Sequence, residues 1–589
     1  MTQQSITPTW NLNDLYSGMD DPKIEEDFSA AEALVRELQD YRGKIATLNP
    51  SEMLTLIKSQ EALALKSNRL GVYASLLSAT NVEVPEVTRF EKQLDARMIQ
   101  LGKETIFIEV EMAQLPEPKW QEFLNAPELN AYKKTLEDTY REAKHTLSEP
   151  EEKILAEKSQ TSSQALLHLF SITTDTLMVD WNGEKKPLEE ISPYLRDPDK
   201  AIRKQAVFAI HAALNTNSKT TPAVFNALIQ DKEISDRLRN YDYPEERRFN
   251  SDDVEKDTVY ALIEAVNKSS HLVERYYTLK KKILGEDTLH WWDRYAPLPK
   301  PKKEISPEEG KEMVLAAFEE FSPQVREIAN GMFEKAHIDW FPSNKKRGGA
   351  FCQFGTPESY PYVLLNYTND VNDVMTLAHE LGHAVHDVLV KDTNVFFQMH
   401  PSLALAEIAS TFSELLLFDK LLAGDLTKED KIALLMGQIE DNFATVHRQI
   451  AMFQFEQAVH TKRRTDGELS KDQIDDLWHE IIKKPFGDSL VWTDEHKNFW
   501  MYIPHVFNWP FYVYSYAFAQ LCTLAIYKTY KEKGSEMVEN YLDILRRGGS
   551  MAPKDNLALA GFDVSTPDFW QNGLKMIEDY IAQLEAELA

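Results

Sequence analysis

Apolar residues recur at three- and four-residue steps along most of this chain, and charged residues fill the positions between them. This spacing predicts amphipathic α-helices, because residues three or four apart share one helix face. Proline and glycine stand mainly at the ends of these stretches, as they do where helices begin and stop. The stretches are residues 24–42, 51–80, 85–113, 118–145, 151–170, 198–215, 220–240, 252–284, 306–334, 428–464, 470–483, 511–532, 534–547 and 567–588.

Three short segments depart from the helical pattern. Residues 348–354 and 361–367 have the composition of neighbouring strands, and residues 178–184 predict a hairpin. We therefore expect a mainly α-helical chain with a small β-sheet. We place an approximate boundary near the hairpin. It separates an N-terminal helical region at 1–195 from a region at 196–589 that contains all the candidate functional residues.

The composition is that of a globular protein, with 43% hydrophobic and 27% charged residues among 589. Its 94 acidic and 65 basic residues give a net charge of −29. This acidity argues against nucleic acid as a partner, because phosphate binding requires a basic surface. The charge is otherwise typical of a solvated surface.

The location expected from the sequence is the cytoplasm. Cys352 and Cys522 are the two cysteines, too few for a disulfide framework, which favours a reducing compartment. The N-terminus lacks a basic segment followed by an apolar run, so we expect no signal peptide. The most apolar stretch, 511–527, is interrupted by tyrosines and Gln520, which favours a buried helix over a membrane span.

The candidate chemistry centres on an HExxH segment at residues 379–383. His379 and His383 are four residues apart, so on a helix both can hold one metal ion. A second helical stretch, which begins near Ser402, carries Glu407 as the third ligand. Three protein ligands with a fourth position open to water form a catalytic zinc site, and we expect one Zn²⁺ per chain. Cobalt or manganese are alternatives.

Glu380 is the candidate general base of this site. It would take a proton from the zinc-activated water and later pass it to the leaving amine. Zinc lowers the pKa of its water to roughly 7, so hydroxide is available at neutral pH. This combination of residues predicts the hydrolysis of peptide bonds.

Four further residues near the motif have two interpretations each. Glu414 lies two helical turns after Glu407 and either supports a histidine ligand or forms an ordinary ion pair. His386 either orients a neighbour such as Glu407 or is a hydrogen-bonded core histidine. Gly349 and Ala350 begin the first predicted strand, where an extended peptide could add as an edge strand. A glycine turn before an ordinary hairpin is the alternative.

A third cluster lies far downstream, at residues 505–516. His505 and a tyrosine hydroxyl could donate hydrogen bonds to the oxyanion that develops during hydrolysis. Tyr512 and Tyr516 are four apart and could face the site together, with Tyr514 elsewhere. An aromatic stripe of this kind is more often part of a core.

These residues resemble the oligoendopeptidase F branch of the thimet oligopeptidase family, over nearly the whole chain. The HExGHxxH element followed by Glu407 is the most specific part of the resemblance. The other matching segments are residues 10–16, 291–298, 346–351, 407–414 and 510–516.

The resemblance implies a large two-lobed helical zincin with a deep central channel, and a small sheet beside the active-site helix. It implies a zinc endopeptidase that cleaves short peptides and excludes folded proteins. Members of the family use a downstream histidine and tyrosines near the substrate carbonyl, which favours His505, Tyr512 and Tyr516. The thimet-like members space two of these tyrosines three apart, whereas this chain offers spacings of two or four, so the register of the tyrosines stays open.

The function expected is therefore that of a cytoplasmic zinc metalloendopeptidase acting on short oligopeptides. Its partners would be peptide substrates, with no nucleic acid and no membrane, and the protein would be a monomer or small homo-oligomer. One alternative is a metallocarboxypeptidase that releases single C-terminal residues. Another is a peptide-binding scaffold without catalysis.

Overall fold

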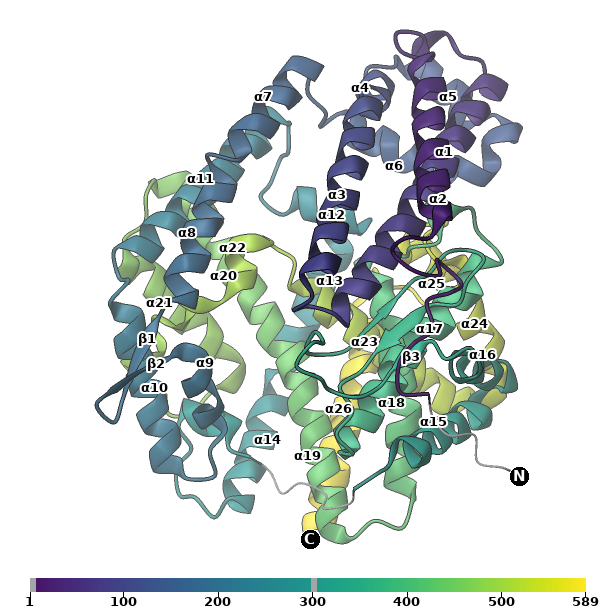
Figure 1. Cartoon of the computed structure of the whole chain (residues 1–589). Helices are drawn as coiled ribbons and strands as arrows, with labels where there is room; N and C mark the ends of the chain where they lie inside the picture. Colours follow the sequence, from purple (N-terminus) through teal and green to yellow (C-terminus); the bar gives the residue numbers. More distant parts are fainter. Residues whose placement is uncertain (1–6, 298–303) are drawn as a thin grey trace. The chain divides into compact units, whose positions relative to one another are not determined.

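The computed structural model describes residues 7–297 and 304–589, and Figure 1 labels many of its helices and strands. Helix accounts for 71% and strand for 3% of the chain, so the predicted mainly α fold with small sheets is confirmed. Leu298, the last residue of one matching segment, lies outside the described residues. The chain forms two compact units, each built from three segments, and each is described by itself.

The first unit comprises Met1–Thr146, Lys302–Asp425 and Thr529–Phe562. Its helices are α1 Pro22–Gln39, α2 Pro50–Ala79, α3 Pro85–Thr105, α4 Phe107–Ala113, α5 Glu117–Leu124, α6 Lys133–Ala143, α15 Pro307–Phe321, α16 Pro323–Glu334, α17 Val371–Lys391, α18 Leu403–Ala423, α24 Val538–Arg547 and α25 Pro553–Leu559. Its strands are β3 Ile338–Asp339, β4 Phe351–Gln353 and β5 Tyr362–Leu364, and its short 3₁₀ turns are Ile45–Thr47, Pro127–Tyr132, Phe396–Gln398 and Gly534–Met537.

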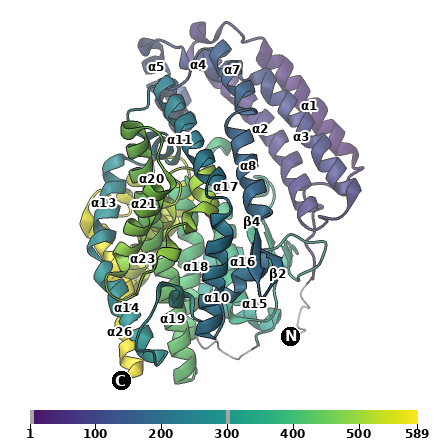
Figure 2. The same ribbon diagram turned by 90° about the vertical axis from the view of Figure 1, so that its left-hand side faces the viewer.

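The long helices α1, α2 and α3 lie along one another, as Figure 2 shows. Their buried faces form an apolar core in which Tyr16 and Tyr73 meet edge to face, with ring centroids 5.1 Å apart. The same core includes Tyr362 and Leu364 of β5. The N-terminal helices therefore help to bury the small sheet.

The sheet of the first unit has the order β3–β5–β4. β3 is parallel to β5, and β4 is antiparallel to it, with Cys352 opposite Val363. The prediction that the segments around β4 and β5 are neighbouring strands is confirmed. β3 was not predicted, because a two-residue strand has no periodicity to detect. β4 stands at an edge of the sheet and pairs with β5 on one side.

The second unit comprises Leu147–Pro301, Leu426–Lys528 and Asp563–Ala589. Its helices are α7 Glu149–Ser159, α8 Ser163–Asp175, α9 Leu188–Ile191, α10 Lys200–Asn215, α11 Thr220–Leu238, α12 Glu246–Asp252, α13 Lys256–Lys268, α14 Ser270–Ile283, α19 Lys428–Thr445, α20 His447–Asp466, α21 Lys471–Lys483, α22 Pro504–Asn508, α23 Tyr514–Lys533 and α26 Pro567–Leu588, with α23 continuing into the first unit's last segment. Its 3₁₀ turns are Ser192–Arg196, Trp291–Tyr295, Lys484–Phe486, Asp494–His496 and Phe499–Tyr502.

The predicted hairpin is confirmed as β1 Met178–Trp181 and β2 Glu184–Pro187, which pair antiparallel. Asn182 and Gly183 form its two-residue turn, with φ of 55° and 84°. Asparagine followed by glycine suits such a turn, because both positions require positive φ. The boundary between regions that we placed beside this hairpin stays a prediction.

Several helix boundaries differ from the predicted ones. The stretch 252–284 is two helices that meet at Ser269, and the stretch 85–113 is two helices joined at Ile106. The helix predicted from residue 511 begins at Tyr514. The short helices α12, α22 and α25 were missed, because helices of five to seven residues are too brief for a periodic pattern.

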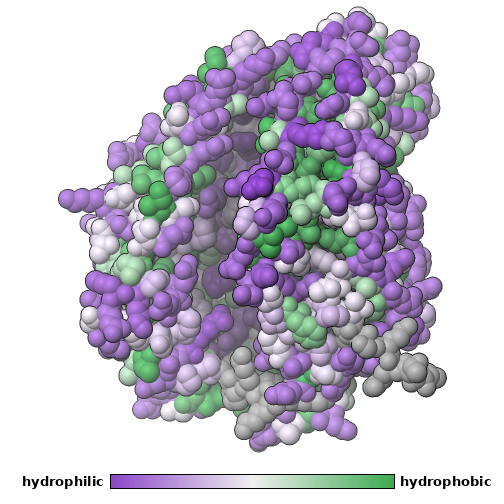
Figure 3. Space-filling model, in the orientation of Figure 1, coloured by the Kyte–Doolittle hydropathy of each residue, from purple (hydrophilic) through white to green (hydrophobic). Residues whose placement is uncertain are grey.

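The face drawn in Figure 3 is mostly hydrophilic, with apolar side chains scattered in small patches. Among the described residues, no helix combines the length and apolar character that crossing a bilayer requires.

Candidate active site

The HExxH residues lie on α17, whose start is fixed by Asp370. The Asp370 side chain accepts a hydrogen bond from the Asn372 amide at 2.9 Å, and Asp373 bonds back to the Asp370 amide at 3.0 Å. This reciprocal pair is a capping box, which satisfies amides that the first turn leaves free. Asn369 has a left-handed φ of 72° in the turn before the helix.

Helix α17 packs closely along α18, and Gly382 lies at the contact. A Cβ atom added to Gly382 would stand 2.5 Å from the carbonyl oxygen of Ala409 and 2.7 Å from the Cα of Ser410. The motif therefore has glycine at this position because the backbone of the other ligand-bearing helix is so close. This close approach sets the distance between the histidines and Glu407.

Replacing Gly382 with alanine is expected to destabilise the protein by about 1–3 kcal/mol, because the new methyl group clashes with backbone that has little room to move. It should also lower metal affinity, since α18 must shift and carries Glu407. Thermal unfolding and metal content of the variant check both effects. Gly437→Ala in α19 is the matched control, because its added Cβ meets nothing within 4 Å and alanine favours a helix interior. An unchanged melting temperature for Gly382→Ala would contradict the prediction.

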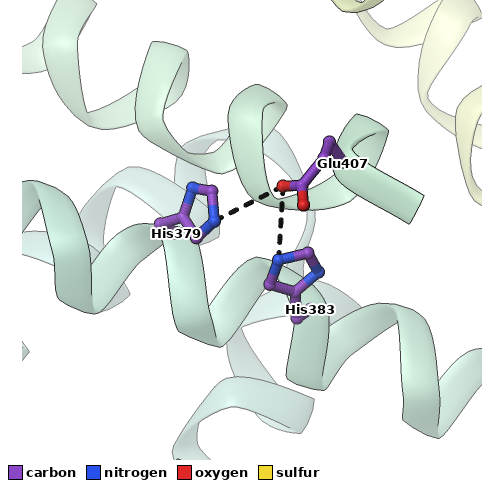
Figure 4. A group of neighbouring side chains, drawn as sticks. All are labelled: His379, His383 and Glu407. Carbon is purple, nitrogen blue, oxygen red and sulfur yellow. Dashed lines mark ion pairs between the residues drawn. The ribbon is translucent and has the colours of Figure 1, made fainter. Parts of the chain in front are cut away.

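Three side chains converge where the two helices meet, as Figure 4 shows. Nε2 of His379 and Nε2 of His383 each lie 3.4 Å from Oε2 of Glu407. Their donor atoms all lie within 4.8 Å of one another, a spacing that can hold a metal ion. Two imidazoles and one carboxylate are the donor set of many catalytic zinc sites, and these residues fit that metal.

The charges around Glu407 favour its ionised form. Burial alone would raise the pKa of Glu407, but the hydrogen bond from His383 and the charges of His383 and His379 hold this pKa at about 2. The Ser410 hydroxyl donates a further hydrogen bond to Oε2 at 2.8 Å. Glu407 is therefore a carboxylate whose orientation is fixed from its own helix. Sequence reasoning missed Ser410, although its spacing of three from Glu407 is one that places neighbours on a helix face.

His379 is oriented by Glu414, which lies on α18. Nδ1 of His379 is hydrogen-bonded to Oε1 of Glu414, so Nε2 is the nitrogen that faces Glu407. Burial lowers the pKa of His379, but this hydrogen bond and the charges of Glu414 and Glu407 outweigh burial and raise the pKa to about 9. Of the two interpretations of Glu414, the geometry favours support of a histidine. Outer carboxylates of this kind fix the tautomer and ring orientation of metal-binding histidines.

Replacing Glu414 with glutamine is expected to lower metal affinity or activity about 10–100-fold, because an amide orients the imidazole more weakly than a carboxylate does. Zinc binding measured by competition with a chelator checks the first quantity, and peptide cleavage checks the second. Glu429→Gln, at an exposed position of α19, is a control with the same chemical change. Affinity and activity both within twofold of the parent would show that the Glu414 bond is not used.

Glu380 and His386 are both buried on α17. Burial raises the pKa of Glu380, which makes its carboxyl group easier to protonate. Burial and the charge of His383 lower the pKa of His386 to about 4, and a hydrogen bond joins His386 to the Leu545 backbone. The surroundings of His386 thus match the core histidine that was its alternative interpretation.

Gly349 and Ala350 lead into the edge strand β4. Gly349 has a left-handed φ of 80°, and its carbonyl oxygen accepts a hydrogen bond from the side-chain amide of Asn366 at 2.7 Å. Glycine suits this position because other side chains are strained there. Edge strands offer unpaired backbone groups to an extended peptide, and β4 carries such an edge beside α17.

The downstream cluster lies in the second unit. The His505 ring is 6.4 Å from that of Tyr512 and 6.2 Å from that of Tyr516, and the two tyrosine rings are 5.1 Å apart. All three side chains are half-buried. Tyr514 is instead fully buried, and its hydroxyl donates to Oδ2 of Asp252 at 2.9 Å. The spacing of four therefore brings Tyr512 and Tyr516 together around His505 and leaves Tyr514 elsewhere.

Comparisons with known proteins identify the family of this chain. The family model for peptidase family M3 matches residues 194–576, and the model described as Oligopeptidase F matches residues 111–178. Oligopeptidase PepF of Bacillus subtilis (strain 168) is 27% identical over 98% of this chain and 87% of its own length. An oligoendopeptidase F homolog of Borreliella burgdorferi is 29% identical over 98% of this chain and 97% of its own.

Solved structures show the same architecture. A crystal structure from Chlamydophila abortus has a TM-score of 0.89 and 25% identity, and the alignment covers 99% of each chain. The oligoendopeptidase-F of Enterococcus faecium has a TM-score of 0.70 and 21% identity over 96% of this chain and 99% of its own. Fold and site thus define a helical metallo-oligopeptidase. The chain belongs to peptidase family M3, as its sequence motifs predict.

Proposed function

We propose that this protein is a zinc endopeptidase that hydrolyses internal peptide bonds of short, unstructured peptides. The convergence of His379, His383 and Glu407 is the observation that supports it most directly. These three residues would hold one Zn²⁺. When bound, zinc would supply a Lewis acid for the scissile carbonyl and make a water nucleophile available near neutral pH.

Glu380 is the proton carrier in this proposal. Its side-chain carboxylate takes a proton from the attacking water and passes it to the nitrogen of the leaving amine. Burial supports this role, because it raises the pKa of the carboxyl toward the operating pH. A carboxyl group with an ordinary pKa would hold the transferred proton less well.

The substrate backbone would add as a strand to the edge of β4, with Gly349 and Ala350 at the start of the contact. His505, Tyr512 and Tyr516 would donate hydrogen bonds to the carbonyl oxygen as its negative charge grows. A segment that adds to this edge must be extended and have unpaired backbone groups, a state that an unstructured peptide adopts readily, which supports short unstructured peptides as the substrate class. A channel that excludes folded proteins, a cytoplasmic location, and a monomeric or small homo-oligomeric state remain part of the proposal.

Mass spectrometry of products tests the proposed function. Zinc-loaded protein is incubated with unstructured peptides of graded length and with a folded protein, with a chelator-treated sample as control. Internal cuts confined to short peptides are the expected result. Trimming of single C-terminal residues would establish a carboxypeptidase instead, and intact peptides in the presence of bound zinc would establish a binding scaffold.

A further inference from the structure

Phe511 has an unusual backbone conformation directly before the downstream tyrosines. Its φ is 62°, and among the described residues it is the one aromatic residue with positive φ. The left-handed region costs a bulky side chain on the order of 1–3 kcal/mol, and such residues persist where their surroundings hold them. The Phe511 side chain is fully buried, so the conformation belongs to a packed part of the second unit.

Helix α20 supplies the groups that hold this turn. The Phe511 amide donates a hydrogen bond to Oε1 of Glu456 at 2.8 Å, and Glu456 is completely buried. The Phe511 ring centroid lies 5.7 Å from Phe453 and 4.7 Å from His460. Phe453, Glu456 and His460 have the spacing of one helix face, so a single face of α20 surrounds residue 511.

The Glu456 carboxyl is a suitable acceptor in this setting. Burial raises the pKa of Glu456 to about 8, so the group holds its proton at neutral pH. A neutral acid can lie in an apolar site at far lower cost than an unpaired carboxylate. The Phe511 amide, in turn, is a buried donor that would be left unpaired without Glu456, and an unpaired buried donor costs free energy.

The orientation of Tyr512 depends on this turn, because Tyr512 is the next residue along the chain. Its amide donates to the Trp509 carbonyl at 3.1 Å, which closes the turn around Phe511. Rotation of Phe511 to a right-handed conformation would redirect the chain at Tyr512 and break this turn. We therefore expect the ring contacts of His505 with Tyr512 and Tyr516 to depend on the left-handed form of Phe511.

A second contact secures the following helix. Besides accepting from the Tyr514 hydroxyl, Asp252 pairs with Arg248 at 3.2 Å. The Arg248 guanidinium also lies 5.5 Å from the Tyr512 ring centroid. The first turn of α23 is thus secured through Tyr514, and Glu456 secures the residue before Tyr512. The two anchored residues, Phe511 and Tyr514, thus lie on either side of Tyr512 along the chain.

We propose that Glu456 is a positioning residue for peptide hydrolysis, which holds Phe511 in its left-handed conformation and thereby aims Tyr512 and Tyr516 beside His505. The inference rests on the proposed function of that cluster. Glu456 itself would touch no reacting atom. Its effect is on the chemical step, because the tyrosines act when charge grows on the carbonyl oxygen.

Kinetics of Glu456→Ala and Glu456→Gln on a short quenched-fluorescence peptide test the proposal. We expect alanine to lower kcat about 10–100-fold with KM within about twofold, because misplaced groups fail mainly in the transition state. Glutamine keeps a neutral oxygen acceptor and should restore kcat to within about threefold of the parent. Glycine adopts positive φ without strain. In a Phe511→Gly background, Glu456→Ala should therefore lower kcat by a much smaller factor.

Asn226→Ala is the matched control. Asn226 is a buried residue of the second unit whose side-chain oxygen accepts from the Leu469 amide at 2.9 Å, so it also fixes a loop amide. It should lower the melting temperature without changing kcat per folded molecule. Unchanged kcat in Glu456→Ala, no rescue by glutamine, or an equal kcat loss in Asn226→Ala would overturn the proposal.

Hydrogen exchange gives a test that does not need catalysis. Glu456→Ala should increase deuterium uptake by the segment 509–516, whereas Glu456→Gln and Asn226→Ala should leave that segment protected. Unchanged uptake in Glu456→Ala would overturn the positioning role. An inactive parent protein with the expected exchange pattern would overturn the proposed function but support the anchoring of Phe511 by Glu456.

Discussion

Replacing Glu380 with glutamine is expected to abolish most peptide cleavage while the protein keeps its metal. Glutamine has nearly the same shape but cannot accept and return a proton. General acid–base catalysis contributes about 10²–10⁴-fold, so kcat should fall by that factor with KM little changed. The metal content should stay at one zinc per chain, since Glu380 is not among the three grouped donors.

Single-turnover cleavage of a short peptide, with zinc measured in the same sample, checks this expectation. Glu380 is buried, so loss of activity by misfolding must be separated from loss of the base. An unchanged melting temperature and zinc content together make that separation. Substantial activity in zinc-loaded Glu380→Gln protein would remove Glu380 from the role of general base.

Elements with strong periodicity were predictable from the sequence. The last helix, Pro567–Leu588, was predicted over the same residues, since its apolar stripe is long and its first residue is proline. The ligand-bearing helices were likewise expected around 379–383 and from Ser402. Spacing alone placed His379 and His383 on one face, because helix geometry fixes which residues share a side.

Contacts between distant segments were not predictable in this way. Periodicity shows which face of a helix is buried, but it does not show what covers that face. The bond from Phe511 to Glu456 joins residues 55 positions apart. For Glu414, spacing suggested support of a histidine as one of two interpretations, but it did not show which histidine Glu414 contacts. The sequence showed that Gly382 belongs to a motif. It did not show why the residue is glycine, because the close contact with the backbone of Ala409 exists only once the two helices are packed.

Replacing Glu407 with alanine is expected to release the metal and with it the activity. The substitution leaves His379 and His383 as the remaining grouped donors, whereas catalytic zinc sites use three protein ligands. The loss of zinc affinity should exceed the 10–100-fold typical of changes to outer residues. Competition with a chelator measures this loss, and Ser410→Ala, which removes one hydrogen bond to Glu407, should weaken affinity by less.

Thermal unfolding gives a second measure of the same loss. A metal that binds only the folded state raises stability by about 4 kcal/mol at a thousandfold excess over its dissociation constant. Zinc should therefore raise the melting temperature of the parent protein clearly, and of Glu407→Ala only slightly at the same concentration. Without zinc the two proteins can differ in stability, because Glu407 also pairs with His379 and His383, so the quantity compared is the rise in melting temperature that zinc causes in each protein. Equal stabilisation by zinc in both proteins would show that Glu407 is not a ligand and that the metal is held elsewhere.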